Sequence, residues 1–225
     1  MGVKDFLEKE YPRLKLKAPL FYNWEVGIRF ELGIDIGLDH YYPNSPYIQG
    51  AFQRAVKLFE AVHSPEDTIL IVLDNDNLDD KKKYRRKLKN FPRYVEKSLL
   101  YKVQYEKLPY IYFEDEEAIL NNYQTHRFTL KCKVADLRYK PLLKDICSVD
   151  LGISSRICSL RVFFINLDKK TIFHVYDDRG CDLIAPSPEV IKDIYINFND
   201  WILDYDRAKI DKVFSKYKKE VNELA

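Results

Sequence analysis

Five aspartates in the last third of the chain are the residues whose type and spacing could do chemistry. Asp177, Asp178 and Asp182 fall in the string YDDRGCD, and Asp204 and Asp206 fall in WILDYDR. Carboxylates that converge in space can bind a divalent metal ion or act as a general acid and base. A metal-dependent hydrolase that uses this aspartate cluster is therefore one hypothesis for the function.

The string YDDRGCD also has a structural interpretation. Aspartate favours turn positions, and Gly180 supplies the residue of positive φ that a four-residue hairpin loop needs. If Tyr176 pairs with Cys181, then His174 and Cys181 lie on one sheet face as diagonal neighbours, about 7–8 Å apart. A Cys–His nucleophile needs hydrogen-bond contact, so no catalytic residue is predicted here.

The string WILDYDR contains side chains that dominate protein interfaces. Asp204 or Asp206 is expected to cap the last helix. Trp201 and Tyr205 are expected to face inward, and Arg207 could pair with an acid of the preceding hairpin turn. Exposed Trp, Tyr and Arg carry much of the energy of protein interfaces, and this chain has 17 tyrosines. Protein recognition is therefore a second hypothesis for this region.

Arg29 and Glu31 lie two residues apart in the string GIRFELG. The glycines alternate with strand residues instead of opening a helix, which excludes a phosphate-binding loop. Arg29 and Glu31 share one face of the predicted strand and could form a charge ladder.

A short acidic string, Asp74 to Asp80, follows an apolar run and suggests a calcium loop. Such a loop requires glycine at its sixth position and a bidentate glutamate at its twelfth. Counted from Asp74, these positions hold Asp79 and Arg85. We therefore expect a solvated loop after a buried strand, and we assign neither a metal nor a cofactor to the chain.

Residues 81–93, KKKYRRKLKNFPR, contain eight Lys or Arg among thirteen residues. Basic side chains could bind phosphates, and the aromatic side chains between them could stack on bases. Together with Arg127, Lys131 and Lys133, they make nucleic-acid binding a third hypothesis. The alternative is a solvated helix face, balanced by the acidic residues on either side of it.

Composition bounds the class of protein. The 225 residues are 46% hydrophobic and 32% charged, and 37 basic against 35 acidic residues give a net charge of +2. This composition excludes disordered and coiled-coil chains. The near-zero net charge provides no overall electrostatic field that would attract nucleic acid. The N-terminus is charged, no window approaches the ~18 apolar residues of a membrane span, and no two of the four cysteines form a C-x-x-C pair. We expect a cytoplasmic protein with reduced thiols and no membrane association.

Hydrophobic periodicity predicts the elements that must position these residues. The predicted strands are 24–36, 68–76, 108–115, 126–134, 161–166, 171–176 and 181–185. The predicted helices are 3–10, 46–62, 81–97, 138–148, one that opens at Ser187-Pro188, and a final one that ends near Tyr217. Strands alternate with helices early and hairpins dominate later. This order predicts an α+β fold, a mixed, largely antiparallel sheet with packed helices and a C-terminal helical pair. Residues 1–225 are expected to form one domain, with 1–21 as a helical or extended lead-in to a core of 22–217.

Three strings occur in order along the chain: GIRFELG (27–33), YDDRGCD (176–182) and WILDYDR (201–207). With these strings the chain resembles a bacterial domain family of unknown function, common in Bacillus-type organisms, across most of residues 22–215. The resemblance implies a bacterial origin and no catalytic residues, since no reaction is assigned to the family. Small bacterial proteins of this kind are often toxin-neutralising, or immunity, proteins, which is an argument by analogy.

The leading hypothesis is a non-catalytic protein-binding module, of which an immunity protein is one form. The chain has recognition side chains without a nucleophile, a base and an orienting group together. Against it, a near-neutral chain lacks the strong acidity of an inhibitor that blocks a basic nuclease. The predicted partner is another protein, and no oligomeric state is predicted. The predicted binding residues are Arg29, Glu31, Asp177, Asp178, Arg179, Asp182, Trp201, Asp204, Asp206 and Arg207.

Overall fold

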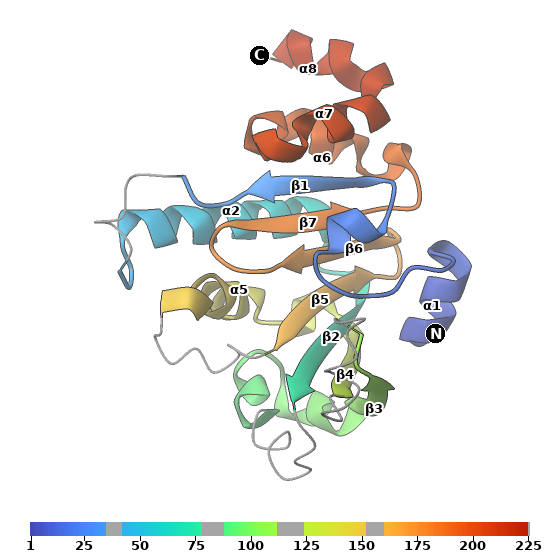
Figure 1. Ribbon diagram of the computed structural model, residues 1–225. Coiled ribbons are helices and arrows are strands. Elements are labelled where there is room, and N and C mark those ends of the chain that lie inside the picture. Colours follow the sequence, from blue (N-terminus) through green and yellow to red (C-terminus); the bar gives the residue numbers. More distant parts are fainter. Residues whose placement is uncertain (35–41, 78–87, 112–123, 152–159, 225) are drawn as a thin grey trace.

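The computed structural model describes residues 1–34, 42–77, 88–111, 124–151 and 160–224, which contain one seven-stranded sheet with helices on both faces (Figure 1). The strand order is β1-β7-β6-β5-β2-β4-β3, and all the neighbouring pairs are antiparallel. The predicted α+β class with a largely antiparallel sheet is confirmed. The strands are β1 (Gly27–Glu31), β2 (Thr68–Asn77), β3 (Gln104–Pro109), β4 (Gln124–Lys133), β5 (Arg161–Asn166), β6 (Thr171–Val175) and β7 (Gly180–Ile184).

Helices alternate with short 3-10 segments along the chain. The α-helices are α1 (Val3–Glu10), α2 (Pro46–Val62), α5 (Tyr139–Cys147), α6 (Lys192–Asn197), α7 (Asp204–Val213) and α8 (Lys218–Leu224). The 3-10 segments are η1 (Leu20–Asn23), η3 (Leu88–Arg93), η4 (Lys97–Lys102), η5 (Val134–Asp136), η6 (Val149–Leu151), η7 (Pro188–Ile191), η8 (Asn199–Trp201) and η9 (Ser215–Tyr217). No helix among those described is both long enough and apolar enough to cross a membrane.

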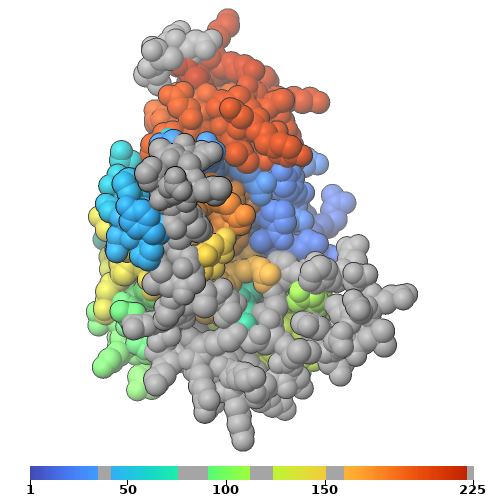
Figure 2. Space-filling model, turned by 60° about the vertical axis from the view of Figure 1, so that its left-hand side comes forward, coloured from blue at the N-terminus to red at the C-terminus, as the bar shows by residue number. Residues whose placement is uncertain are grey.

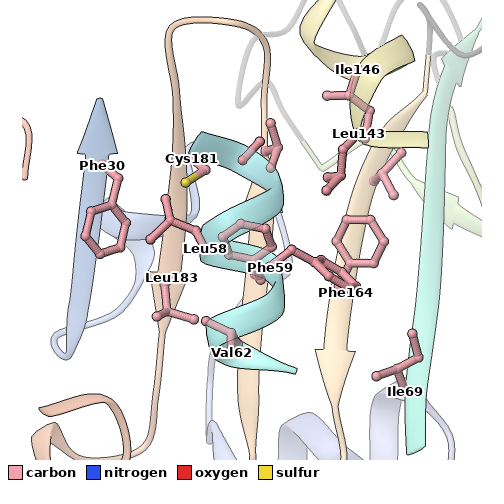
Figure 3. Close-up of a cluster of buried hydrophobic side chains, with 14 of the residues drawn as sticks. Phe30, Leu58, Phe59, Val62, Ile69, Leu143, Ile146, Phe164, Cys181 and Leu183 are labelled. Carbon is pink, nitrogen blue, oxygen red and sulfur yellow. The ribbon is translucent and has the colours of Figure 1, made fainter. Parts of the chain in front are cut away.

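The larger core lies between the sheet and helices α2 and α5. The predicted Ser45 cap of α2 is present, since the Ser45 hydroxyl accepts a hydrogen bond from the Ile48 amide at 3.2 Å. The apolar face of α2 then points at the sheet, and Phe59 packs edge-on against Phe164 of β5 with ring centres 5.2 Å apart (Figure 3). Phe30 of β1 points into the same core. The larger core therefore extends across one face of the sheet from the β1 edge to β4.

The opposite face of the sheet is covered by the N-terminal residues. Phe6 and Leu16 are buried against a second apolar cluster that includes Leu70 of β2. The Tyr11 hydroxyl donates to the carbonyl of Lys170 at 2.6 Å. Residues 1–21, predicted as a lead-in, therefore form the second layer of the structure.

Two predicted strands have different limits in the structure. The strand expected at 24–36 is paired only over β1, and residues 35 and 36 lie outside the described ranges. β2 instead continues to Asn77, so the solvated loop expected from Asp74 onward is wrong for the first residues of that string. Asp74 and Asn75 are both 0% exposed. Asp74 can be buried because Arg127 on the neighbouring strand β4 pairs with it.

The basic region and the following strand also differ from expectation. Of the helix predicted at 81–97, residues 81–87 lie outside the described ranges, and η3 and η4 are 3-10 segments, with Pro92 inside η3. Pro92 lacks the N–H that a longer helix would need. The strand predicted at 108–115 lies at 104–109 instead, and residues 112–115 are not among those described.

The C-terminal helices cover the β1 edge of the sheet, at the top of Figure 1. The helix predicted to open at Ser187-Pro188 is divided into η7, α6 and η8. The chain then touches the outer side of β1, where Phe30 and Ile202 form an antiparallel bridge and the Leu203 amide donates to the Arg29 carbonyl at 3.0 Å. The edge of the sheet is thus closed by residues that lead into α7.

A pH dependence follows from His63, the residue that ends α2. His63 is 4% exposed, its ring stacks on Phe59 at 4.1 Å, and burial lowers its pKa to about 4. The unfolded chain would bind a proton near pH 6.5, so the free energy of unfolding should fall by about 3 kcal/mol between pH 7 and pH 4 through this group alone. Urea unfolding at both pH values should show a smaller fall for His63→Gln than for the wild type. An unchanged pH dependence in the variant would contradict this origin.

Candidate functional site

Arg29 brings together two other predicted binding residues, Asp182 and Asp206. Asp182 is its register partner on β7, and the Arg29 Nε donates to Asp182 Oδ1 at 2.9 Å. Asp206 of α7 approaches from the other side, with its Oδ2 at 3.4 Å from Arg29 Nη1. Asp182 is 0% exposed and Asp206 is 5% exposed. Arg29 therefore neutralises two buried carboxylates that are far apart in the sequence.

The polar groups of this cluster are held from several directions. Asp182 Oδ2 accepts a hydrogen bond from the Phe21 amide at 3.0 Å. The rings of Tyr22 and Tyr176 lie 4.6 and 5.5 Å from the Arg29 guanidinium. Burial alone would lower the pKa of Arg29, but the hydrogen bond and charge of Asp182 raise it above its ordinary value. The guanidinium is therefore permanently charged.

Tyr22 connects this buried cluster to the surface. Its hydroxyl donates to Asp206, with both carboxylate oxygens at 3.0 Å, and accepts from Arg29 Nη1 at 3.0 Å. Burial of the hydroxyl, and then its hydrogen bond to Asp206, raise the pKa of Tyr22. The residue is nevertheless 46% exposed, so part of it reaches solvent.

The hairpin turn after β6 is held by its own residues. Asp177 Oδ1 accepts from the Arg179 amide at 2.7 Å, and the Arg179 guanidinium pairs with Asp177 and, at 3.5 Å, with Asp150. Asp177 and Asp178 are 5% and 1% exposed, whereas the Arg179 side chain is 70% exposed. Only Arg179 of this turn is presented outward.

The register of this hairpin differs from the one expected. Cys181 pairs with Val175, and His174 pairs with Asp182. Because the side-chain period in a strand is two, His174 and Cys181 project from opposite faces of the sheet. The diagonal Cys–His arrangement is wrong.

The residues around Trp201 follow a different pattern from the predicted one. Arg207 binds no acid of the hairpin turn among the described contacts. It pairs with Asp204 at 3.1 Å and donates to the carbonyls of Asn199 and Ile202, each at 3.1 Å. The Asn199 carbonyl also accepts the Ile202 amide at 3.1 Å, so the guanidinium adds a second hydrogen bond to that carbonyl at the end of η8. Tyr205 is 85% exposed, so its predicted inward orientation is also wrong.

Three further predictions concern single side chains. Neither Asp204 nor Asp206 caps α7, whose N-cap is Leu203 without a side-chain hydrogen bond. Trp201 packs beneath Arg54, with the guanidinium 4.8 Å from its ring. Glu31 forms no ladder with Arg29 in the described contacts, and its carbonyl accepts from Arg54 Nη1 at 3.0 Å.

The five aspartates do not gather around one point. Each arginine described above neutralises its own acids: Arg29 binds Asp182 and Asp206, Arg179 binds Asp177, and Arg207 binds Asp204. Within the described ranges, no three His, Cys, Asp or Glu side chains are grouped so as to hold a metal ion. The geometry of these residues therefore gives no support to the hydrolase hypothesis.

A second buried ion pair was missed by the sequence interpretation. Arg127 Nε and Nη2 donate to Asp74 Oδ1 and Oδ2 at 2.8 and 2.6 Å, and Arg127 Nη2 also donates to the Leu16 carbonyl at 3.3 Å. Arg127 is 7% exposed and so does not belong to a basic outer face. Of the three residues proposed to help residues 81–93 bind nucleic acid, only Lys131 and Lys133 are exposed.

The structure also shows a groove beside the Arg29 cluster. Its volume is about 440 Å³, and it lies between the N-terminal layer, the residues before β1, and α7. The residues that line it are Pro12, Arg13, Leu14, Tyr22, Asn23, Trp24, Glu25, Val26, Pro186 and Lys209. None was predicted as a binding residue, because nothing in the sequence brings residues 12–26 to Lys209.

Fold and site together define a helix-covered antiparallel α+β protein whose candidate surface is aromatic and charged. The chain belongs to the family described as domain of unknown function DUF3885, whose model matches residues 3–206. It is similar to the uncharacterized protein YnaE of Bacillus subtilis (strain 168), with 29% identity over 213 residues that cover 91% of this chain and 99% of that protein. No solved structure matches the chain. The predicted membership of a bacterial family of unknown function is confirmed.

Removal of the Arg29 guanidinium tests the cluster. Arg29→Met would leave Asp182 and Asp206 buried without their cation, so the free energy of unfolding should fall by about 3–5 kcal/mol. Arg138→Met is the matched control. Its ion pair with Glu96 is exposed on both sides, with 53% and 67% of the two side chains accessible, so its loss should change stability by about 1 kcal/mol or less. Equal losses for the two variants in urea unfolding would show that Arg29 is not a central support.

Proposed function

We propose that this protein is a non-catalytic protein-binding module of the bacterial cytoplasm. Its contact surface would be the corner surface, which we define as Tyr22, Asp204, Tyr205, Arg207 and Lys209. The observation that carries the proposal is the 85% exposure of Tyr205 on a helix that Arg29 and Asp206 hold against the sheet.

The corner surface has the composition of an interface centre. Tyr205 and Lys209 lie four residues apart on α7 and so project from one side of the helix. Lys209 Nζ lies 5.3 Å from the ring of Tyr22. This contact connects α7 to the residue that follows the N-terminal layer. In Figure 2 the N-terminal residues (blue) lie directly below the C-terminal helices (orange and red). Tyrosines on a rigid support lose little conformational entropy on binding, which makes them effective anchors.

The reactive groups of the described residues do not favour catalysis. Burial raises the pKa of the Cys132 thiol to about 12 and raises that of Cys181 well above its ordinary value. Both thiols are therefore protonated at neutral pH and poor nucleophiles. The acids near the corner surface are neutralised by arginines, as described above. The buried thiols and the paired acids contribute to the stability of the fold. Recognition is therefore a better explanation of the corner surface than catalysis.

A toxin is one class of partner that fits the proposal, and the protein would then act as an immunity protein. The support for this form is analogy with other small bacterial proteins. The net charge of +2 provides no strong acidic field, so the partner would be recognised by contact more than by long-range attraction.

Affinity capture tests the protein-binding function. The immobilised protein is incubated with extract of the source bacterium, and each recovered protein is then purified and titrated against wild type, Tyr205→Ala and Tyr101→Ala. Tyr101, on η4, is 94% exposed and serves as the matched control. Loss of a tyrosine anchor costs about 2 kcal/mol or more, so Tyr205→Ala should weaken binding at least tenfold. If no purified protein distinguishes the two variants, the proposal fails.

A further inference from the structure

The groove, which shares Tyr22 and Lys209 with the corner surface, contains two basic groups without acidic partners. Arg13 and Lys209 line it, and among the residues that the structure describes neither forms an ion pair with a carboxylate. Lys209 Nζ instead lies 4.4 Å from the ring of Phe21. In α1 of the same layer, by contrast, Lys4 pairs with Glu8 at 3.8 Å and Lys9 pairs with Glu10 at 3.4 Å. The groove therefore retains positive charge that an acidic ligand could neutralise.

The N-terminal layer carries one more exposed basic residue, Lys15, just outside the groove lining. Leu14 and Leu16 are 8% and 3% exposed, and Arg13 and Lys15, which alternate with them, are exposed. Lys15 also forms no ion pair within the described ranges. The alternation fixes which side chains point outward, since the leucines are anchored in the core of the N-terminal layer.

Two aromatic side chains, Tyr22 and Trp24, line the groove, and their polar groups are already hydrogen-bonded within the protein. The Trp24 Nε1 donates to the Ala185 carbonyl at 2.8 Å. The Tyr22 hydroxyl is bound to Asp206 and Arg29. What the rings offer to a ligand is therefore apolar area.

The backbone at Arg13 is unusual for an arginine. Its φ is 73°, in the left-handed region, where residues with a Cβ cost about 1–2 kcal/mol more than glycine does. An arginine at this position is therefore less stable than a glycine would be. This conformation also supplies a clean test, because glycine fits the same backbone without strain.

We propose that the groove binds an extended acidic peptide segment of the protein partner. Its carboxylates would pair with Arg13 and Lys209, and an apolar side chain between them would pack on Tyr22 and Trp24. This inference rests on the proposed protein-binding function and specifies the chemistry of the partner. Glu25, which also lines the groove, favours a peptide over nucleic acid, because its carboxylate can accept the backbone N–H groups of a peptide, which a sugar–phosphate backbone lacks.

Tryptophan fluorescence can report binding at this groove. The chain has two tryptophans, so Trp201→Phe leaves Trp24 as the only reporter. The probe is a capped peptide, Glu-Glu-Pro-Leu-Glu-Glu, titrated beside the same peptide with glutamine in place of each glutamate. We expect saturable binding of the acidic peptide that weakens with salt, and at least tenfold weaker binding of the glutamine peptide.

The residues are tested by Arg13→Gly combined with Lys209→Met. This double variant should bind the acidic peptide about tenfold more weakly while its unfolding midpoint stays equal to that of the parent or rises. Lys212→Met, on the same helix but outside the groove lining, is the matched control and should bind as the parent does. Equal binding of both peptides, unaffected binding by the double variant, or tighter binding of single-stranded oligothymidine than of the acidic peptide would each overturn the inference.

The result also separates this inference from the proposed function. If a purified partner depends on Tyr205 but is unaffected by the double variant at Arg13 and Lys209, the protein-binding function stands and the groove assignment falls. If the acidic peptide binds as expected but no protein depends on Tyr205, the corner surface is wrong and the groove assignment stands alone.

Discussion

The arrangement of the candidate surface depends on one buried guanidinium. Arg29 lies on edge strand β1, and its charge is shared between Asp182 of the neighbouring strand and Asp206 of α7. Asp182 also accepts from the Phe21 backbone, and Asp206 accepts from Tyr22. The N-terminal layer, β1, β7 and α7 thus meet at one cluster. Since a buried carboxylate is costly without its cation, the four segments stabilise one another.

The two edges of the sheet are protected in different ways. On the β1 side, the bridge between Phe30 and Ile202 covers the backbone groups and places α7 beside the N-terminal layer. On the other side, β3 is largely exposed, carries Glu106 and Lys107, and ends at Pro109. Charges and proline on an edge strand oppose pairing with another chain. Covering β1 with a helix brings Tyr205 next to Tyr22, so the same contact that closes the sheet also creates the corner surface.

Local patterns predicted more of the fold than of the site. The apolar face of α2 and the hairpin of β5 and β6 follow directly from periodicity and turn residues, and both were predicted correctly. Asp74 and Arg127 were misjudged because each looks solvent-facing until the pairing of β2 with β4 places them opposite one another. The same holds for the groove, where Arg13 and Lys209 meet only through tertiary packing. The division into a lead-in and a core stays a prediction, although residues 1–21 bury Phe6 and Leu16 against the sheet.

Recognition by this protein would require α7 to be held in place before a partner arrives, and Arg29 is the group that holds it. Native-state hydrogen exchange of Arg29→Met measures this directly, with the amides of α7 compared with those of α2. We predict that exchange in α7 becomes at least tenfold faster while α2, whose apolar residues pack on one face of the sheet, keeps most of its protection. Unchanged exchange in α7, or an equal increase in both helices, would contradict the account.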